Sequence, residues 1–182
     1  MDAISESDSG LLAAARHGDE SSFLTLYRRY RTPLFRFAWR LTGSVATAED
    51  VLQECFLALL EGARFDVDRG SLRAYLFGIA RNLALKRVRL SERESEELED
   101  TEADLDPLED LLSAERSEVV ARAVMALPHF QREAIVLFEY EELSLEEIAE
   151  VAGIEAGAVK ARLHRARETL RRQLAPLIAA RA

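Results

Sequence analysis

Apolar residues along this chain recur mostly at intervals of three and four, the spacing of one helix face, and no stretch alternates convincingly as a β-strand does. The pattern therefore predicts an all-α fold. Before residue 91 we expect helices over about 8–17, 20–40, 47–62 and 71–90. After residue 112 we expect helices over about 113–126, 129–140, 145–152 and 156–174.

The segment between these two groups, SERESEELEDTEADLDPLED (91–110), holds eleven Asp or Glu residues, one Arg and no aromatic residue. Subtracting its net charge of −10 from the chain's total of −9 leaves +1 for the other 162 residues. Such a composition is typical of a solvated linker. We therefore predict an acidic flexible linker over 91–112, which joins helical domains over 8–90 and 113–176. It can act as a plain tether, or it can also imitate a nucleic-acid backbone and shield basic helices; both interpretations stay open.

Hydropathy and residue content argue against several classes of function. No apolar run approaches the roughly 20 residues of a membrane-spanning helix, so no membrane insertion is expected. The N-terminus lacks a secretory pattern, and the single Cys55 fits a reducing cytosol, so we expect a cytoplasmic protein. The three His residues and Cys55 show no metal-ligand spacing, and neither a phosphate-binding glycine loop nor a nucleophile-base pair is present. We expect no metal, no cofactor and no enzymatic activity.

The stretch LSLEEIAEVAGIEAGAVKARLHRARETL (143–170) carries the signals of a helix-turn-helix. Ser144 and Glu147 have the spacing of a capping box, which starts a short helix. Gly153 is placed to end that helix in the left-handed conformation, and a second helix begins a few residues later. In such a motif the second helix lies in the major groove of DNA.

On the second helix the residues separate into two faces. Laid out at about 100° per residue, the apolar ones share one arc, which we predict to be buried: Val159, Leu163, Ala166 and Leu170. The stretch 157–172 holds six Lys or Arg residues and one acidic residue, whereas an ordinary solvated helix face interleaves both signs. We predict that Lys160 and Arg165 reach base edges, beside Ala161 and His164 at the centre of the outward face. The residues predicted to contact phosphate are Arg162, Arg167, Arg171 and Arg172.

In the N-terminal half, Asp19 is predicted to begin a helix that Pro33 interrupts, and Thr47 to cap the next helix. The buried stripe of that next helix is predicted to be Val51, Leu52, Cys55, Phe56 and Leu59. Cys55 is then a small core residue rather than a reactive thiol. Asp50, Gln53 and Glu54 share the outward face, which spacing alone assigns equally well to a binding surface or to ordinary polar surface.

Residues 69–91 contain six Lys or Arg residues and no acidic one. Leu72, Leu76, Ile79 and Leu83 are predicted to form the core stripe of the helix, with Arg73, Phe77, Arg81 and Arg87 on another face and Tyr75 and Asn82 on the other side of the stripe. Lys86 and Arg89 add to the positive charge. Basic residues interleaved with aromatic ones suit unstacked nucleic acid, whose bases stack on rings. Core packing explains Phe77 and Tyr75 equally well, and that alternative stays open.

Four stretches resemble, in order, the extracytoplasmic-function sigma factors of the sigma-70 family. They are GDESSFLTLYRRYRTPLFRFAWRLTG, AEDVLQECFLALL, RGSLRAYLFGIARNLALKRVR and LPHFQREAIVLFEYEELSLEEIAEVAGIEAGAVKARLHRARETLRRQL. The resemblance covers about 11–90 and 113–174. It implies a sigma2-like and a sigma4-like domain that direct core RNA polymerase to promoter DNA, with contacts to the β′ clamp and the β flap. An anti-sigma factor is a further candidate partner.

Position by position, the resemblance implies that Asp50, Gln53 and Glu54 contact the β′ clamp helices. It implies that the stretch from Arg73 to Arg89 recognises and melts the −10 element. Lys160, Ala161, Arg165 and Arg167 match the helix that recognises the −35 element. The function predicted is thus an alternative sigma factor.

A competing class is a two-domain helix-turn-helix regulator that binds an operator without polymerase. It explains 143–172, but it gives no reason for the Asp50, Gln53 and Glu54 face or for the basic-aromatic helix at 71–90. A nucleic-acid enzyme would need a catalytic group that the sequence lacks.

Overall fold

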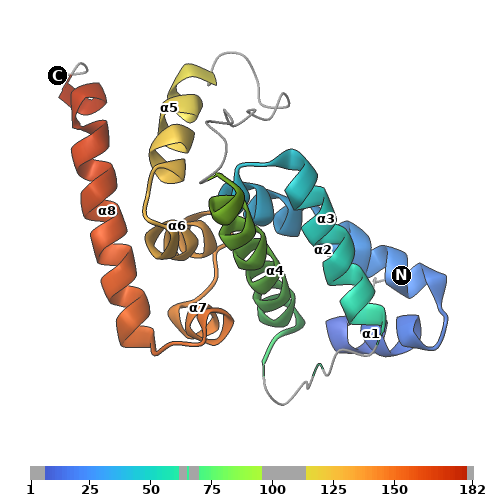
Figure 1. Ribbon diagram of the computed structural model, residues 1–182. Coiled ribbons are helices and arrows are strands. Elements are labelled where there is room, and N and C mark those ends of the chain that lie inside the picture. The colour runs from blue at the N-terminus through green and yellow to red at the C-terminus, as the bar shows by residue number, and fades with distance from the viewer. Residues whose placement is uncertain (1–6, 62–64, 66–69, 96–113, 180–182) are drawn as a thin grey trace.

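The computed structural model describes residues 7–61, 65, 70–95 and 114–179. Within these residues every regular element is a helix, in agreement with the predicted fold class. The predicted linker, 91–112, falls mostly outside them. Its first residues continue the preceding helix to Ser95, five residues beyond the predicted end. We call α1–α4 the N-terminal unit and α5–α8 the C-terminal unit (Figure 1).

The N-terminal unit consists of α1 (Asp8–Arg16), α2 (Glu20–Thr42), α3 (Val45–Leu60) and α4 (Leu72–Ser95). Asp19 caps α2 by accepting a hydrogen bond from the Ser22 backbone N–H, as predicted. Ser44, not the predicted Thr47, caps α3: the Ser44 hydroxyl accepts from the Thr47 N–H at 3.2 Å. The helix therefore begins at Val45, two residues earlier than predicted. Ser44 adopts the extended cap conformation directly after Gly43.

Pro33 does not interrupt α2, contrary to the prediction, and the helix runs unbroken from Glu20 to Thr42. A proline in a helix removes one backbone hydrogen bond and crowds the preceding turn. Here the turns on both sides are held by burial, because Tyr30, Leu34 and Phe37 are all core residues. Tertiary packing thus outweighs the local preference of Pro33.

The C-terminal unit consists of α5 (Ala114–Met125), α6 (His129–Ile135), the π-helical turn η2 (Val136–Tyr140), α7 (Leu145–Ala152) and α8 (Ala156–Ala179). The predicted helix over 129–140 is therefore an α-helix that widens into a π turn, closed by a bond from the Glu141 N–H to the Val136 carbonyl at 3.1 Å. The widened turn begins where Val136 and Leu137 enter the core.

Both signals of the helix-turn-helix are confirmed. The Ser144 hydroxyl accepts from the Glu147 N–H at 3.1 Å, while the Glu147 carboxylate accepts from the Ser144 N–H at 2.9 Å. Gly153 ends α7 in the left-handed conformation, with φ 65° and ψ 38°. Both signals depend only on residues within one turn, so they fix the start and end of α7 without tertiary contacts.

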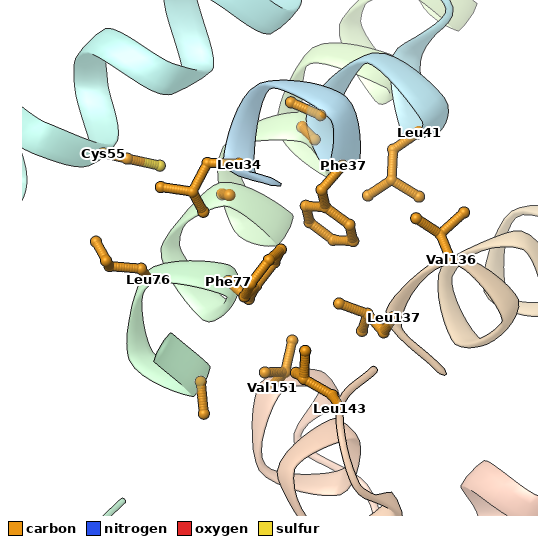
Figure 2. Packing of buried hydrophobic residues seen from close by; sticks show 14 of the residues in the cluster. Leu34, Phe37, Leu41, Cys55, Leu76, Phe77, Val136, Leu137, Leu143 and Val151 are labelled. Carbon is orange, nitrogen blue, oxygen red and sulfur yellow. The ribbon is translucent and has the colours of Figure 1, made fainter. Parts of the chain in front are cut away.

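The two units share one hydrophobic core. Helix α4 packs against α2 and α3 of its own unit and against α7 of the other, and Figure 1 shows it between them. At the centre of this contact Phe37 and Phe77 meet edge to face, with ring centroids 5.2 Å apart. Figure 2 shows Phe77 directed toward Leu137, Leu143 and Val151 of the C-terminal unit.

The buried face of α4 differs from the predicted one. Leu72 and Leu76 are buried as expected, but Ile79 and Leu83 are only partly buried, and Phe77, Ala80 and Ala84 take the central core positions. The prediction placed Phe77 outside the core stripe. Because α4 is covered by both units, its apolar arc is wider than that of a helix with one buried side.

Candidate nucleic-acid interface

Helix α8 separates its buried and exposed residues as predicted. Val159, Leu163 and Ala166 are at most 3% exposed, and Leu170 packs partly against them. The exposed residues include seven of the predicted contacts: Lys160, Ala161, His164, Arg165, Arg167, Arg171 and Arg172. These side chains lie on one face of α8, in the part of the helix that follows the α7–α8 turn. The arrangement places a run of positive charge on the second helix of a helix-turn-helix, where a DNA groove would receive it.

Arg162 is turned away from this open face. Its side chain is 21% exposed, its guanidinium lies 4.7 Å from the Phe130 ring centroid, and its Nη1 is 4.0 Å from Glu133 Oε2. In this conformation Arg162 therefore packs toward the interior rather than lying open to phosphate. The sequence could not indicate this, because Glu133 comes from another helix.

Arg167 pairs at the surface with Glu139, at 2.8 Å, and its guanidinium lies 5.2 Å from the Phe138 ring centroid. Both partners of the ion pair are about half exposed. Exposed pairs of this kind contribute about 0–1 kcal/mol. Arg167 can therefore exchange Glu139 for a phosphate at little cost.

A shallow cleft of about 230 Å³ runs beside the exposed face of α8. Its apolar lining comes from Phe138, Leu145 and Leu163, and its polar lining from Lys160, His164, Arg167, Glu168 and Arg171. The basic face of α8 is thus continuous with a hollow between α7, α8 and η2.

The N-terminal half of α4 is covered. Arg81 Nε is 2.5 Å from Glu133 Oε1, and the Arg73 guanidinium donates to the Glu141 carbonyl. Phe77 is fully buried, which corrects its placement on a basic, nucleic-acid-facing side. Tyr75 is partly buried, with its ring 5.4 Å from that of Phe65. Three of the side chains predicted to meet DNA are therefore covered by the C-terminal unit.

The following turns of α4 are open. Asn82, Lys86 and Arg89 are exposed, as their predicted role requires. Arg87 is half-buried and forms an ion pair with Glu54 of α3. The predicted contacts on α4 thus fall into a covered set near Arg73 and an exposed set near Lys86.

On α3, Asp50 and Gln53 are exposed, and the Glu54 side chain is 44% exposed despite its pairing with Arg87. The structure places all three on the outward side of the helix. Cys55 lies on the opposite side, fully buried, and burial raises its thiol pKa to about 12. Cys55 is thus a core residue, as predicted.

Sequence reasoning missed two buried carboxylates, Glu133 and Glu141, at 1% and 5% exposure. Burial raises the pKa of Glu141 to about 7, although Arg40, Arg73 and Arg36 oppose the shift. One signal was available: Glu133 directly precedes the apolar run 134–138 and lies one helical turn before Leu137. The sequence did not indicate that its partner, Arg81, lies 52 residues earlier.

Across the described residues, no helix combines the length and apolarity needed to cross a membrane. The same residues hold no cluster of three or more His, Cys, Asp or Glu side chains arranged around a metal position.

Comparison with known proteins gives two family matches. Residues 26–94 match the family described as sigma-70 region 2, and residues 117–170 match the family described as sigma-70, region 4. The first match contains α3 and all of α4 except Ser95, and the second contains α7 and the first part of α8. Of the exposed residues described above on α3, α4 and α8, all but Arg171 and Arg172 therefore fall inside the matched regions.

Two curated relatives match over most of their length. The ECF RNA polymerase sigma factor SigW of Bacillus subtilis is 34% identical over 176 residues, covering 89% of this chain and 94% of SigW. The ECF RNA polymerase sigma factor SigM of Mycobacterium tuberculosis is 34% identical over 173 residues, covering 92% of this chain and 85% of SigM.

Two solved structures are similar in fold. The sigma factor RpoE of Bartonella quintana, in complex with the anti-sigma factor NepR, has a TM-score of 0.72 and 27% identity, covering 84% of this chain and 96% of RpoE. CnrH, in complex with the cytosolic domain of CnrY, has a TM-score of 0.69 and 28% identity, covering 96% of this chain and 99% of CnrH.

Proposed function

Because this chain belongs to the extracytoplasmic-function sigma factors of RNA polymerase, a family that acts in transcription initiation, we propose specific roles for three of its surfaces. The exposed face of α8 recognises the −35 element, α4 recognises the −10 element, and the outward face of α3 binds core polymerase. The observation that carries the proposal is the exposed basic face of α8, the second helix of a helix-turn-helix whose first helix, α7, begins with a capping box. The two proposed functional domains are residues 8–90 and 113–176.

On α8, Lys160 and Arg165 contact base edges. Both are exposed near the N-terminal half of the helix, the part that enters the major groove most deeply in this motif. A bidentate arginine prefers guanine O6 and N7. Arg167 and Arg171 contact phosphate, which positions the helix and makes its binding depend on salt.

On α3, Asp50, Gln53 and Glu54 contact the β′ clamp of core polymerase. Support comes from their common outward side and from the match of residues 26–94 to sigma-70 region 2. Exposed acidic and amide groups offer several hydrogen-bond acceptors to a basic partner. The β flap is the proposed partner of the C-terminal unit.

On α4, the exposed Asn82, Lys86 and Arg89 contact promoter DNA near the −10 element, together with Arg87. Arg73, Tyr75, Phe77 and Arg81 belong to the same proposed surface but lie against neighbouring protein groups in this conformation. Their participation therefore requires a different arrangement of the two units.

We also propose that an anti-sigma factor binds this chain, since the similar RpoE and CnrH chains were solved in complex with the anti-sigma factor NepR and with the cytosolic domain of CnrY. The place of action is the cytoplasm, where core polymerase and promoter DNA are located.

The decisive experiment is transcription in vitro with purified core polymerase, the full-length chain and a library of host intergenic DNA. Transcript 5′ ends are sequenced. We expect new start sites that share two upstream elements, and an Asp50→Ala/Gln53→Ala variant that has lost core binding. Glu20→Ala, an exposed carboxylate on α2, serves as the control and retains activity.

Repression of existing start sites, or no effect on them, would instead indicate a regulator that acts without core binding. Retention of core affinity by the Asp50→Ala/Gln53→Ala variant would remove the role assigned to α3 but not those assigned to α4 and α8.

A further inference from the structure

Lysine is rare in this chain, although positive charge is not. Only two of its 24 Lys and Arg residues are lysines, Lys86 and Lys160. Lys86 lies on α4 and Lys160 lies on α8, so each proposed promoter-binding helix carries one. Among the side chains, primary amines therefore occur only on the two helices with proposed DNA contacts.

The lysines differ from the surrounding arginines in chemistry rather than in charge. A lysine amine that has lost its proton is a nucleophile and a target of acetylation, whereas arginine stays protonated in proteins. Acylation converts the lysine cation into a neutral amide. An acylating agent therefore removes one positive charge from α4 and one from α8, and it leaves the arginines of both helices unchanged.

Both amines are accessible from solvent. Each of the two lysines is exposed. Within the part of the chain that the structure describes, neither lysine side chain forms an ion pair or a hydrogen bond. Arg87, the neighbour of Lys86, is by contrast held by Glu54. Neither burial nor a bonded partner among these residues protects the two amines from a reagent in solution.

Lys160 also lies at the edge of the cleft beside α8. The apolar lining of this cleft comes from Phe138, Leu145 and Leu163. A hydrated ammonium group gains nothing from such a surface, whereas the hydrophobic effect drives the alkyl chain of an acyl group onto it. Lys86 does not line this cleft. The cleft therefore favours acylation of Lys160 over Lys86, and more strongly for a longer acyl chain.

We propose that Lys160 and Lys86 are acylation sites, and that an acyl phosphate reacting there switches off the binding of promoter DNA by α8 and α4. The inference rests on the roles proposed above for these two helices. It adds a class of reagent that acts on them, and it assigns Lys160 as the preferred site.

The reaction is an acyl transfer without oxidation or reduction. Lys160 first loses a proton to water, and the lone pair of its neutral Nζ attacks the carbonyl carbon of the acyl phosphate. The bond between that carbon and the phosphate oxygen breaks, and the phosphate leaves with the bonding electrons. The phosphate takes a second proton from the amine, so that an amide and hydrogen phosphate remain. The same steps apply to Lys86.

The first measurement is the rate of acylation at each lysine. The full-length chain is incubated with acetyl phosphate or with butyryl phosphate, folded or in urea, and peptide mass spectrometry follows both sites. With acetyl phosphate both lysines should react in the folded chain at close to their rates in urea, because neither is buried. Butyryl phosphate should modify Lys160 about threefold faster than Lys86 in the folded chain and equally fast in urea.

The second measurement is the affinity of the holoenzyme for promoter DNA. The chain is treated with acetyl phosphate and freed of reagent before core polymerase is added. Affinity should fall at least about tenfold, as it should for an untreated Lys160→Gln variant, which carries a neutral amide at that position. The control is Lys86→Arg/Lys160→Arg, which keeps both charges but has no side-chain amine. Treated and untreated samples of this variant should bind alike.

The outcomes separate the modification from the DNA roles. Protection of both lysines in the folded chain would overturn the acylation sites, while weaker binding by Lys160→Gln would still support the role of α8. Equal losses in the treated wild type and the treated double variant would overturn the switch, because another group would be responsible. Unchanged binding by both Lys160→Gln and the fully acetylated wild type would overturn the switch together with the DNA roles of the two lysines. Equal rates with butyryl phosphate in the folded chain would overturn the preference for Lys160.

Discussion

Arg87 on α4 forms an ion pair with Glu54 on α3, so the helix proposed to recognise the −10 element is bonded directly to the face proposed to bind polymerase. The two side chains are 31% and 44% exposed. Glu54 therefore has two candidate roles, as a contact to polymerase and as the group that orients Arg87.

A double-mutant cycle separates these roles. Glu54→Gln and Arg87→Ala should each change the free energy of unfolding by about 1 kcal/mol or less, because both side chains keep partial contact with water. Core-polymerase affinity is then measured for both single variants and the double variant. A direct contact predicts that Glu54→Gln weakens affinity equally with or without Arg87. An effect that disappears in the Arg87→Ala background would show that Glu54 acts only through Arg87.

Arg165 and Arg171 should differ in the kind of DNA binding that they lose. Arg165→Ala is expected to cost about 1–3 kcal/mol on the cognate −35 element and to relax preference at one base pair. Arg171→Ala should weaken all duplexes alike and reduce the slope of log K against log salt by about one. Binding of the holoenzyme to matched and single-substitution duplexes, at several salt concentrations, measures both quantities. Equal losses for Arg165→Ala on cognate and random DNA would contradict its assignment to a base.

Local signals predicted the helix-turn-helix closely. Ser144, Glu147 and Gly153 determine the bounds of α7 through contacts within one turn, and the outward face of α8 follows from helical spacing. Neither the bounds of α7 nor the outward face of α8 depends on contacts with residues distant in the sequence. The basic face of α8 could therefore be read from the sequence almost residue by residue.

Features that depend on distant segments could not be predicted. Phe77 is central to the core because the C-terminal unit supplies a second buried side to α4. Pro33 remains helical because core contacts hold the turns around it. The pairing of Glu133 with Arg81 joins two helices 52 residues apart, and no periodicity within either helix indicates it.

Gly153 gives a prediction about the stability of the C-terminal unit. An added Cβ there meets nothing within 4 Å, so only the backbone conformation, φ 65°, opposes a side chain. Gly153→Ala should lower the free energy of unfolding by about 1–2 kcal/mol, and Gly153→Asn by less. Gly157→Ala, inside α8 and equally unobstructed, is the matched control and should raise it by about 0.5–1 kcal/mol. Urea denaturation measures all three, and a loss at Gly157 as large as that at Gly153 would contradict the explanation.

Glu141 should make the protein less stable as the pH rises toward neutrality. Its pKa in the folded chain is raised to about 7 from an ordinary 4.5, mainly because burial disfavours the charged form. The cations that oppose this shift are Arg40, Arg73 and Arg36, on α2 and α4. Between these two pKa values the folded chain binds a proton that the unfolded chain has lost, so the free energy of unfolding falls as pH rises from 4.5 through 7. At full extent the loss is at most about 3 kcal/mol.

His129 acts in the opposite direction over part of this range. Burial and then nearby arginines lower its pKa to about 4 from 6.5, so its contribution raises stability as pH rises from 4 through 6.5 and levels off about one unit above 6.5. Urea denaturation of the wild type and Glu141→Gln at pH 6.5, 7.2 and 8 isolates Glu141 as the difference between the two proteins, because His129 is present in both. We expect the wild type to lose stability across this range relative to Glu141→Gln, which has no proton to lose. Parallel pH profiles for the two proteins would show that the Glu141 carboxyl is not desolvated in the folded chain.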